Sequence, residues 1–558
     1  MFHLLIGISS VAFGQETKWL QHRWEIDPPL GDIWEEKSIY QNILFDVEQL
    51  KSRFAEERLS VAQNLCREYS NPKLLKKGRA IELLLEGIEN RDEHAQVRRA
   101  MISALLLLGD GSLAKQIWSY AEADSVVRPT VEKQLIRWKS PVAIDVWRKR
   151  IADNNATPTD LATALEGIAV VGSVEDRAIL QAVISANNSS MANKFLAASA
   201  LGALATEGMN DFAQKVMDSN LEQRHLMAAH LLKRHSGEST AKQMRQILSE
   251  GSASAQLVAF RVLSESMPDI SQEFGKQMAT HSDPGLRTMA LQLLQRYSDE
   301  ESLKVQGQLL GDPHPNVRNL VVKNLLEKAG QGQRPLVDQC LLQHLASEEW
   351  TGLEKGIALA VGLKDRSHCK TFLRLLDHPR PEVNMMAGWA LMELGDEAET
   401  LAGMLKHAEK MVADLKSSTS TTEYSDTDQI RLSYLNEGFG KNRFVAAESI
   451  LLVHIPKGPR FANTSRSSAI WALGKLNKGK VNADLLSSLN GRLSDLDPLI
   501  PEDYLVRFSC NLALGEMANP ESREIVAKFR ENPTTPIGIA ATWALSEIDK
   551  ASQTKSIE

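Results

Sequence analysis

Leucines recur at a fixed spacing along most of the chain, inside alanine-rich stretches with helical periodicity. Five of them are 31 residues apart: Leu201, Leu232, Leu263, Leu294 and Leu325. Three precede these at a spacing of 30, and two follow at steps of 34 and 32: Leu105, Leu135, Leu165, Leu359 and Leu391. Near the end of the chain Leu514 and Leu545 are again 31 residues apart. One spacing held over so many units predicts an internal structural repeat.

Each repeat predicts two short helices. In residues 302–330, "SLKVQGQLLGDPHPNVRNLVVKNLLEKAG", apolar residues at steps of three and four predict a first helix over Ser302–Leu310. The sequence GDPHP then ends this helix, because proline lacks the amide proton and disfavours helix in the residue before it. Asp312 suits a cap of the turn, and Pro315 suits the first turn of the second helix. The second helix places four apolar residues on one stripe: Val317, Leu320, Val321 and Leu325.

A pair of such helices is too small to bury its apolar stripe alone, but stacked pairs can bury it between them. We therefore predict an all-α fold, an α-solenoid (superhelix) of about 13 or 14 helix pairs. No apolar stretch reaches the roughly 20 residues that a transmembrane helix needs.

Further repeats carry the same order of features, as in "THSDPGLRTMALQLLQRYSD", "DHPRPEVNMMAGWALMELGD" and "RDEHAQVRRAMISALLLLGDG". This pattern resembles the HEAT repeat family, and its length is most similar to the bacterial HEAT-like repeats of phycobilin lyases. The resemblance covers about residues 47–548 and implies the fold much more than an activity. It also implies a ladder between a turn Asp and an Arg early in the second helix.

Two repeats match this ladder, with Asp312 and Arg318 in one and Asp92 and Arg98 in the other. The repeat at 377–384 departs from it, because Asn384 stands where Arg is expected.

Three repeats share the letters Trp-Ala-Leu, which place Trp389, Trp471 and Trp543 at one position of the second helix. Alanines beside these tryptophans let helices approach closely. We therefore favour tryptophans buried in the seam between helices over an aromatic stripe that stacks a ligand.

The N-terminal residues differ from the repeats. Residues 1–14 are apolar and end with Ala12 and Gly14, which suit a small-residue cleavage site before Gln15. This predicts a signal peptide and a periplasmic or secreted protein, although the segment lacks Lys and Arg. If that interpretation fails, the segment is a buried or frayed N-terminus and the protein is cytoplasmic. Residues 15–46 are rich in tryptophan and proline and predict a cap over the first repeat, or a docking segment for a partner: Trp19, Trp24 and Trp34.

The repeat spacing breaks between Leu391 and Leu473, which are 82 residues apart. We expect a solenoid over 47–396, an irregular helical insertion with a Ser/Thr-rich loop over 397–460, repeats again over 461–550, and a tail at 551–558. The loops at 416–428 and 454–466 are the first places where we expect partner contacts. In the second loop, four residues suit an anion or a peptide: Lys457, Arg460, Phe461 and Arg466. The lengthened turn in "LSDLDPLIPEDYLVR" is expected to be structural.

Composition and motifs limit the function classes. The net charge of −7 gives no general affinity for nucleic acid. The four cysteines are widely spaced and do not predict a disulfide framework. The histidines at 225, 230 and 235 are five residues apart and do not share one helix face, so we expect no metal site. No nucleotide-binding or hydrolase motif is present, and we expect no catalytic residue and no cofactor.

These features favour a non-enzymatic scaffold that binds another protein or a cell-envelope component through its solenoid surface. The alternatives are an enzyme and a regulatory subunit of an envelope complex. The resemblance to HEAT-like repeats admits a phycobilin lyase-type enzyme, whose tetrapyrrole-binding residues we do not find. It also admits a DNA glycosylase, which fits poorly with the acidic charge. We expect a protein partner, no nucleic acid, and no integral membrane segment beyond the signal.

Overall fold

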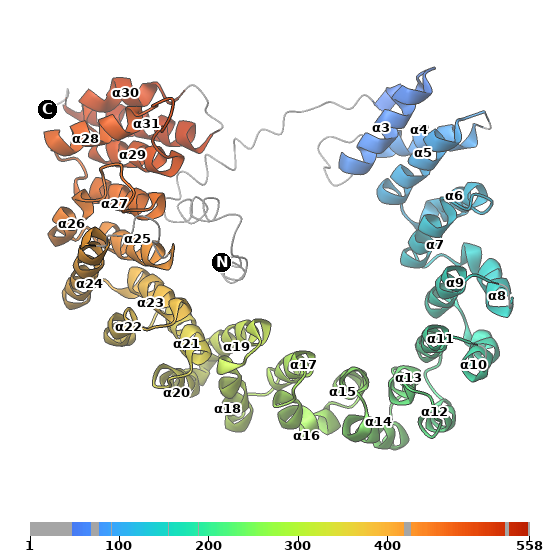
Figure 1. Ribbon diagram of the computed structural model, residues 1–558. Coiled ribbons are helices and arrows are strands. Elements are labelled where there is room, and N and C mark those ends of the chain that lie inside the picture. Colours follow the sequence, from blue (N-terminus) through green and yellow to red (C-terminus); the bar gives the residue numbers. More distant parts are fainter. Residues whose placement is uncertain are drawn as a thin grey trace. The chain divides into compact units, whose positions relative to one another are not determined.

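The computed structural model describes residues 47–68, 77–90, 92–153, 156–187, 189–417, 426–530 and 535–555 (Figure 1). Over these ranges the chain is helical and contains no strand, as the sequence predicts. The described residues fall into two compact units, 47–293 and 294–555.

The first unit is a series of short α-helices joined by tight turns. Its α-helices are α3 (Ala55–Glu68), α4 (Lys77–Glu89), α5 (Ala95–Leu108), α6 (Ala114–Ala121), α7 (Arg128–Arg137), α8 (Ile144–Ala152), α9 (Pro158–Val171), α10 (Arg177–Ser185), α11 (Met191–Leu204), α12 (Asn210–Met217), α13 (Arg224–Leu231), α14 (Glu238–Glu250), α15 (Ala253–Ser266), α16 (Pro268–Ala279) and α17 (Pro284–Leu294). Four 3₁₀ turns accompany them: η1 (Val47–Lys51), η2 (Gly111–Leu113), η3 (Pro141–Ala143) and η4 (Val174–Asp176).

The second unit has the same construction. Its α-helices are α18 (Glu300–Gln308), α19 (Pro315–Lys328), α20 (Arg334–Leu345), α21 (Trp350–Gly362), α22 (Cys369–Leu375), α23 (Pro381–Leu394), α24 (Ala398–Ser417), α25 (Asp426–Lys441), α26 (Glu448–Leu452), α27 (Asn463–Leu476), α28 (Ala483–Ser494), α29 (Tyr504–Met517), α30 (Arg523–Ala527) and α31 (Pro536–Lys555). Between them lie a π turn, η6 (Ala329–Gln333), and four 3₁₀ turns: η5 (Leu309–Gly311), η7 (Arg366–His368), η8 (Val445–Ala447) and η9 (Pro520–Ser522).

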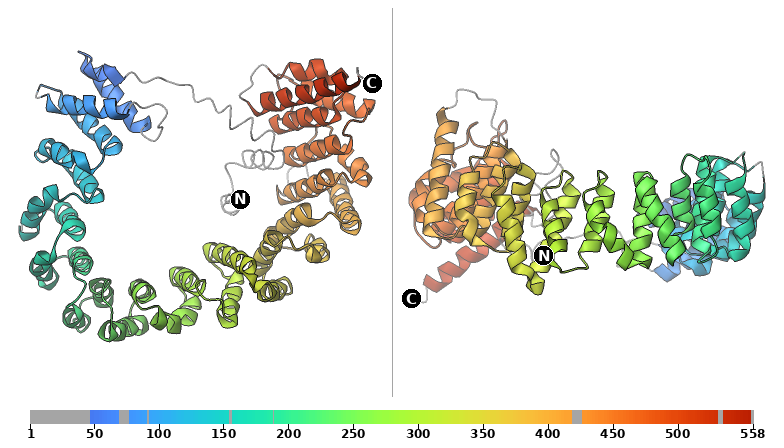
Figure 2. Two further views of the ribbon diagram at one scale, coloured as in Figure 1. Left: turned by 180° about the vertical axis from the view of Figure 1, so that it is seen from behind. Right: turned by 90° about the horizontal axis from the view of Figure 1, so that it is seen from below.

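Helices pack in the order that the repeat predicts. In the first unit each odd-numbered helix from α9 to α15 packs against the odd-numbered helix before it and against its own even-numbered partner. In the second unit α19, α21, α23, α25, α27, α29 and α31 form one continuous stack, seen in the left view of Figure 2. From α4 with α5 to α30 with α31, the helices form fourteen consecutive pairs in the described part of the chain. This architecture is an α-solenoid in each unit.

Local chemistry explains where helices begin. Six helices start at a proline, whose missing N–H is no loss in the first turn: Pro158, Pro268, Pro284, Pro315, Pro381 and Pro536. Others start after a capping side chain, as where the Ser190 hydroxyl accepts a hydrogen bond from the Asn193 amide at 3.2 Å. The predicted helices at 302–310 and after Pro315 correspond to α18 with η5 and to α19.

The arginine early in the second helix of a repeat bonds to its own turn. Arg318 Nη1 donates to the Asp312 carbonyl oxygen at 2.7 Å, while the Asp312 carboxylate caps the amide of His314 at 2.8 Å. Asn384 Nδ2 donates in the same way, at 3.0 Å, to the carbonyl of the residue six positions before it, His378. Asn384, which stands where Arg is expected, therefore makes the same contact with its turn through a shorter side chain.

Two of the three Trp-Ala-Leu tryptophans, Trp471 and Trp543, lie against glycines of the preceding odd-numbered helix. A Cβ atom on Gly440 of α25 would lie 2.6 Å from Cζ3 of Trp471, and one on Gly515 of α29 would lie 2.5 Å from Cζ3 of Trp543. Trp471 is buried, and Trp389 and Trp543 are half-buried. The glycines are thus required for close approach, and Trp471 and Trp543 fill helix seams as we favoured.

The segment 397–460, expected to be an irregular insertion, contributes ordinary members of the stack. Its helix α25 packs against both α23 and α27, and α24 and α26 pack beside them. Longer helices take up part of the extra sequence length, since α24 has 20 residues and α25 has 16, and the long loop at 453–462 takes up another part. The Ser/Thr-rich part at 418–425 lies outside the described residues, as do the predicted signal peptide, the cap at 15–46 and its three tryptophans.

Candidate partner-binding site formed by two loops

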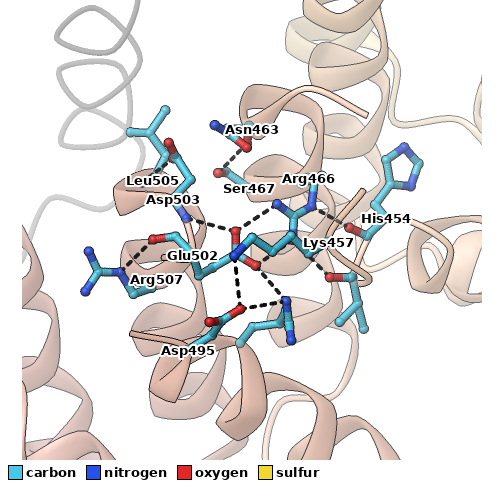
Figure 3. Close-up of polar contacts among 12 residues, drawn as sticks. His454, Lys457, Asn463, Arg466, Ser467, Asp495, Glu502, Asp503, Leu505 and Arg507 are labelled. Carbon is cyan, nitrogen blue, oxygen red and sulfur yellow. Dashed lines mark hydrogen bonds and ion pairs between the residues drawn. The ribbon is translucent and has the colours of Figure 1, made fainter. Parts of the chain in front are cut away.

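Two long loops lie side by side in the second unit, and we call them together the paired-loop surface. They are residues 453–462, before α27, and residues 495–503, before α29. Lys457 Nζ joins them, because it lies 3.3 Å from Asp495 Oδ2 (Figure 3). The same amine also donates to the carbonyl oxygen of Ile500. Both loops precede an odd-numbered helix of the continuous stack, so they lie at one edge of it.

A buried ion pair between Arg466 and Glu502 connects the two loops. Arg466 of α27 is 2% exposed, and its Nη1 and Nη2 donate to Glu502 Oε1 and Oε2 at 2.9 and 2.8 Å. Its Nε and Nη2 also donate to the carbonyl oxygens of His454 and Ile455 at 3.2 and 3.1 Å (Figure 3). One guanidinium therefore holds the start of the first loop and the end of the second.

Further charges close this network. Arg492 Nη1 lies 3.2 Å from Asp495 Oδ2 and 3.1 Å from Glu502 Oε2. Burial by itself would raise the pKa of the Glu502 carboxyl, but the hydrogen bonds from Arg466 and from the Asp503 amide outweigh it and lower that pKa. Glu502 is therefore ionised, which matches its bidentate pairing with Arg466.

The backbone of the second loop is closed by internal hydrogen bonds. Asp497 Oδ1 accepts from the amides of Leu499 and Ile500 at 2.8 and 3.0 Å. The remaining amides from 497 to 503 donate within the loop to Asp495 or Glu502, and residues 498 and 501 are prolines without an N–H. The loop thus has a defined conformation and no unsatisfied amide over these residues.

This loop presents apolar side chains to solvent. Leu496, Leu499 and Ile500 are 57%, 91% and 67% exposed. Large apolar side chains gathered on one rigid loop are typical of an interaction site.

The four residues predicted in the first loop have different environments. Arg460 is exposed, and Phe461 is half-buried with its ring centroid 4.3 Å from that of His454. Lys457 is occupied by its contacts to the second loop. The prediction for Arg466 is wrong, because this side chain is buried in the ion pair with Glu502 and supports the surface from within. Trp19, Trp24 and Trp34 lie outside the described residues.

Sequence reasoning missed the apolar tip of the second loop. We expected the turn in "LSDLDPLIPEDYLVR" to be structural because of its two prolines. The available signal was Leu496, Leu499 and Ile500 in a turn between acidic residues, where other repeats have polar residues.

The described part of the chain contains no group of three or more His, Cys, Asp or Glu placed to hold a metal ion. All four cysteines are free thiols. No described helix is both long and apolar enough to span a bilayer.

Comparisons with known proteins give similarity in architecture alone. No protein-family model and no curated protein matches the chain. Solved structures that are similar include importin beta in an ammonium sulfate condition, with 13% identity and a TM-score of 0.46 over 92% of this chain and 74% of that one. Kap95p with RanGDP has 13% identity and a TM-score of 0.45, covering 91% and 77% of the two chains. The Kap95:Nup1 complex has 11% identity and a TM-score of 0.45, covering 96% and 81%. At these values the comparisons support no argument about function.

Proposed function

We propose that this protein is a non-enzymatic scaffold with HEAT-like repeats that binds another protein through the paired-loop surface. The observation that supports this proposal is the rigid display of Leu496, Leu499 and Ile500 above a buried ion network. Rigid apolar anchors bind with little loss of conformational entropy, which is the main cost of ordering a loop in a complex.

Affinity capture of the tagged full chain from its own source tests the proposal. Leu499→Ser with Ile500→Ser removes the apolar tip and leaves its backbone bonds in place. Val481→Ser is the matched control, because Val481 is 74% exposed and follows the other end of α27. We expect a companion protein that the control retains and the double variant loses. An identical set of companions in all three samples would contradict the proposal.

We also propose that the protein works in the periplasm or outside the cell, with residues 1–14 removed as a signal peptide. The support is the apolar N-terminal segment with Ala12 and Gly14 before Gln15. The intact mass of the protein purified from its source measures this directly. A mass that still includes residues 1–14 would contradict it.

A further inference from the structure

We infer that the partner of the paired-loop surface is a folded protein with an apolar pocket that is bordered by a basic side chain. This inference rests on the proposed function and adds the chemistry of the partner. It follows from the second loop, which projects an acidic group among its apolar ones.

The apolar part of the pocket follows from exposure. Leu499 and Ile500 keep most of their surface in water, at 91% and 67% exposed, and Leu496 joins them at 57%. Burying such aliphatic side chains is favourable in rough proportion to the area removed from water. Nothing in the described chain covers them, so the gain is available to a partner.

The basic side chain at the border of the partner's pocket is inferred from Asp497. Its carboxylate is exposed and stands between Leu496 and Leu499 in the loop. Hydrogen bonds from the Ile500 and Leu499 amides lower the pKa of Asp497, so the group is ionised at neutral pH. A surface that receives the apolar tip must therefore also receive one negative charge. A Lys or Arg beside the pocket compensates this charge, whereas an apolar wall would take the carboxylate out of water with only the two loop amides and the nearby charge of Lys457 to offset the cost.

The same carboxylate argues against two other occupants. A bilayer would have to accept an ionised carboxylate together with the aliphatic side chains, and an anionic lipid surface would repel it. A second copy of this chain that docked through the same loop would bring two Asp497 side chains together. Like charges brought together at an interface oppose association.

The loop is ready for insertion without rearrangement. Between 497 and 503 each amide is bonded inside the loop or replaced by proline, so burial leaves no backbone donor unsatisfied. Lys457, Arg466 and Arg492 hold its base. The pocket therefore needs to supply apolar surface and one cation, and no backbone acceptors.

The test uses the full chain with a photo-reactive benzoyl-phenylalanine in place of Ser494, an exposed residue beside the loop. The cross-linked protein is identified by mass spectrometry, produced in pure form, and titrated against three variants by calorimetry at low and at high salt. Asp497→Asn keeps an oxygen for the Leu499 and Ile500 amides and removes the charge. Leu499→Ser with Ile500→Ser removes the apolar tip. Asp110→Asn is the matched control, since Asp110 is also an exposed turn carboxylate that caps an amide, that of Ser112.

We expect the double variant to weaken binding at least about thirtyfold, the usual effect of truncating an interface anchor. We expect Asp497→Asn to weaken it about threefold to tenfold at low salt and by less at high salt, because salt screens the charge pair. The Asp110 control should bind like the wild type.

The outcomes separate the two proposals. Loss of binding in the double variant with no effect of Asp497→Asn at either salt overturns the basic border and leaves the proposed function standing. No effect of either variant, or no adduct from Ser494, overturns the proposed function. If the protein sediments with phosphatidylcholine or phosphatidylglycerol vesicles and this depends on Leu499, the loop binds a bilayer and the inference of a protein pocket is overturned. If it forms a dimer in sedimentation velocity and this depends on Leu499, the loop binds a second copy of the chain and the inference is likewise overturned.

Discussion

Arg466 illustrates how one buried side chain can be mistaken for a binding residue. Replacing it with Met would leave the Glu502 carboxylate buried with Arg492 as its remaining guanidinium, and would release the carbonyls of His454 and Ile455. Breaking a buried ion pair on one side costs about 3 kcal/mol. We expect Arg466→Met to lower the free energy of unfolding of the second unit by about that amount, measured by denaturant titration of circular dichroism.

Two further variants serve as a control and a rescue for Arg466→Met. Arg460→Met removes a similar but exposed side chain and should change the stability by less than about 0.5 kcal/mol. Arg466→Met combined with Glu502→Leu removes both charges and should recover part of the loss, since a hydrophobic pair can replace a buried ion pair. Equal stability of Arg466→Met and Arg460→Met would show that the pair does not support the loops.

Lys364 carries backbone strain at the end of α21. Its φ is 55°, in the left-handed region that favours glycine, and the amide of Asp365 closes the helix end by donating to the Ala360 carbonyl at 2.9 Å. We expect Lys364→Gly to raise the midpoint of thermal unfolding, with a gain of about 0.5 to 1 kcal/mol. Lys406→Gly, in the exposed middle of α24, should lower the stability by about 1 kcal/mol. A loss of stability in both variants would contradict this account of the turn.

At the scale of one element, the turn from α26 to the first loop contains a titratable group. His454 is buried, its Nδ1 lies 3.0 Å from the Ile450 carbonyl oxygen, and Arg466 and Lys416 add nearby positive charge. Burial lowers the pKa of His454 to about 4, from an ordinary value of 6.5. The folded turn therefore holds the neutral imidazole, whereas the unfolded chain takes up a proton below pH 6.5.

The sign of the pH effect follows from this difference. The unfolded state binds more protons between pH 6.5 and 4, so the stability of this region is full above pH 6.5 and falls as the pH drops toward 4. We expect the protection factors of the amides in 448–462, which are exchange rates corrected for the intrinsic effect of pH, to fall over that range in the wild type and less in His454→Gln. The same comparison above pH 7 is the control, because there the pH-dependent part is absent. Parallel pH profiles of the two proteins would contradict the assignment to His454.

At the scale of the whole molecule, the fold followed from local rules that repeat. Helix periodicity, turn prolines and the regular leucine spacing act within about 31 residues, and they predicted stacked helix pairs correctly. The leucine spacing breaks at 397–460 because spacing counts residues, whereas α25 within this segment still packs between α23 and α27.

The candidate site was predicted only in part, for a related reason. Composition marked the loop at 454–466, but Arg466 is buried by Glu502, a residue of the next repeat. The exposed tip at 496–500 depends on hydrogen bonds within its own turn and on Lys457 from the neighbouring repeat. Contacts between neighbouring repeats decide which side chains face solvent. The periodic pattern within one repeat carries no information about these contacts.

Because each repeat contacts mainly its neighbours, damage to one seam should remain local. Gly515→Ala tests this, since the new Cβ would lie 2.5 Å from Cζ3 of Trp543 and 2.9 Å from Cα of Ala544. Forcing α29 and α31 apart costs about 1 to 3 kcal/mol. We expect faster hydrogen exchange in α27, α29 and α31, with no change in 47–293. Gly491→Ala is the matched control, because nothing lies within 4 Å of its Cβ position in α28, and it should slow exchange there. Faster exchange throughout the chain in Gly515→Ala would mean that the repeats unfold as a single cooperative unit.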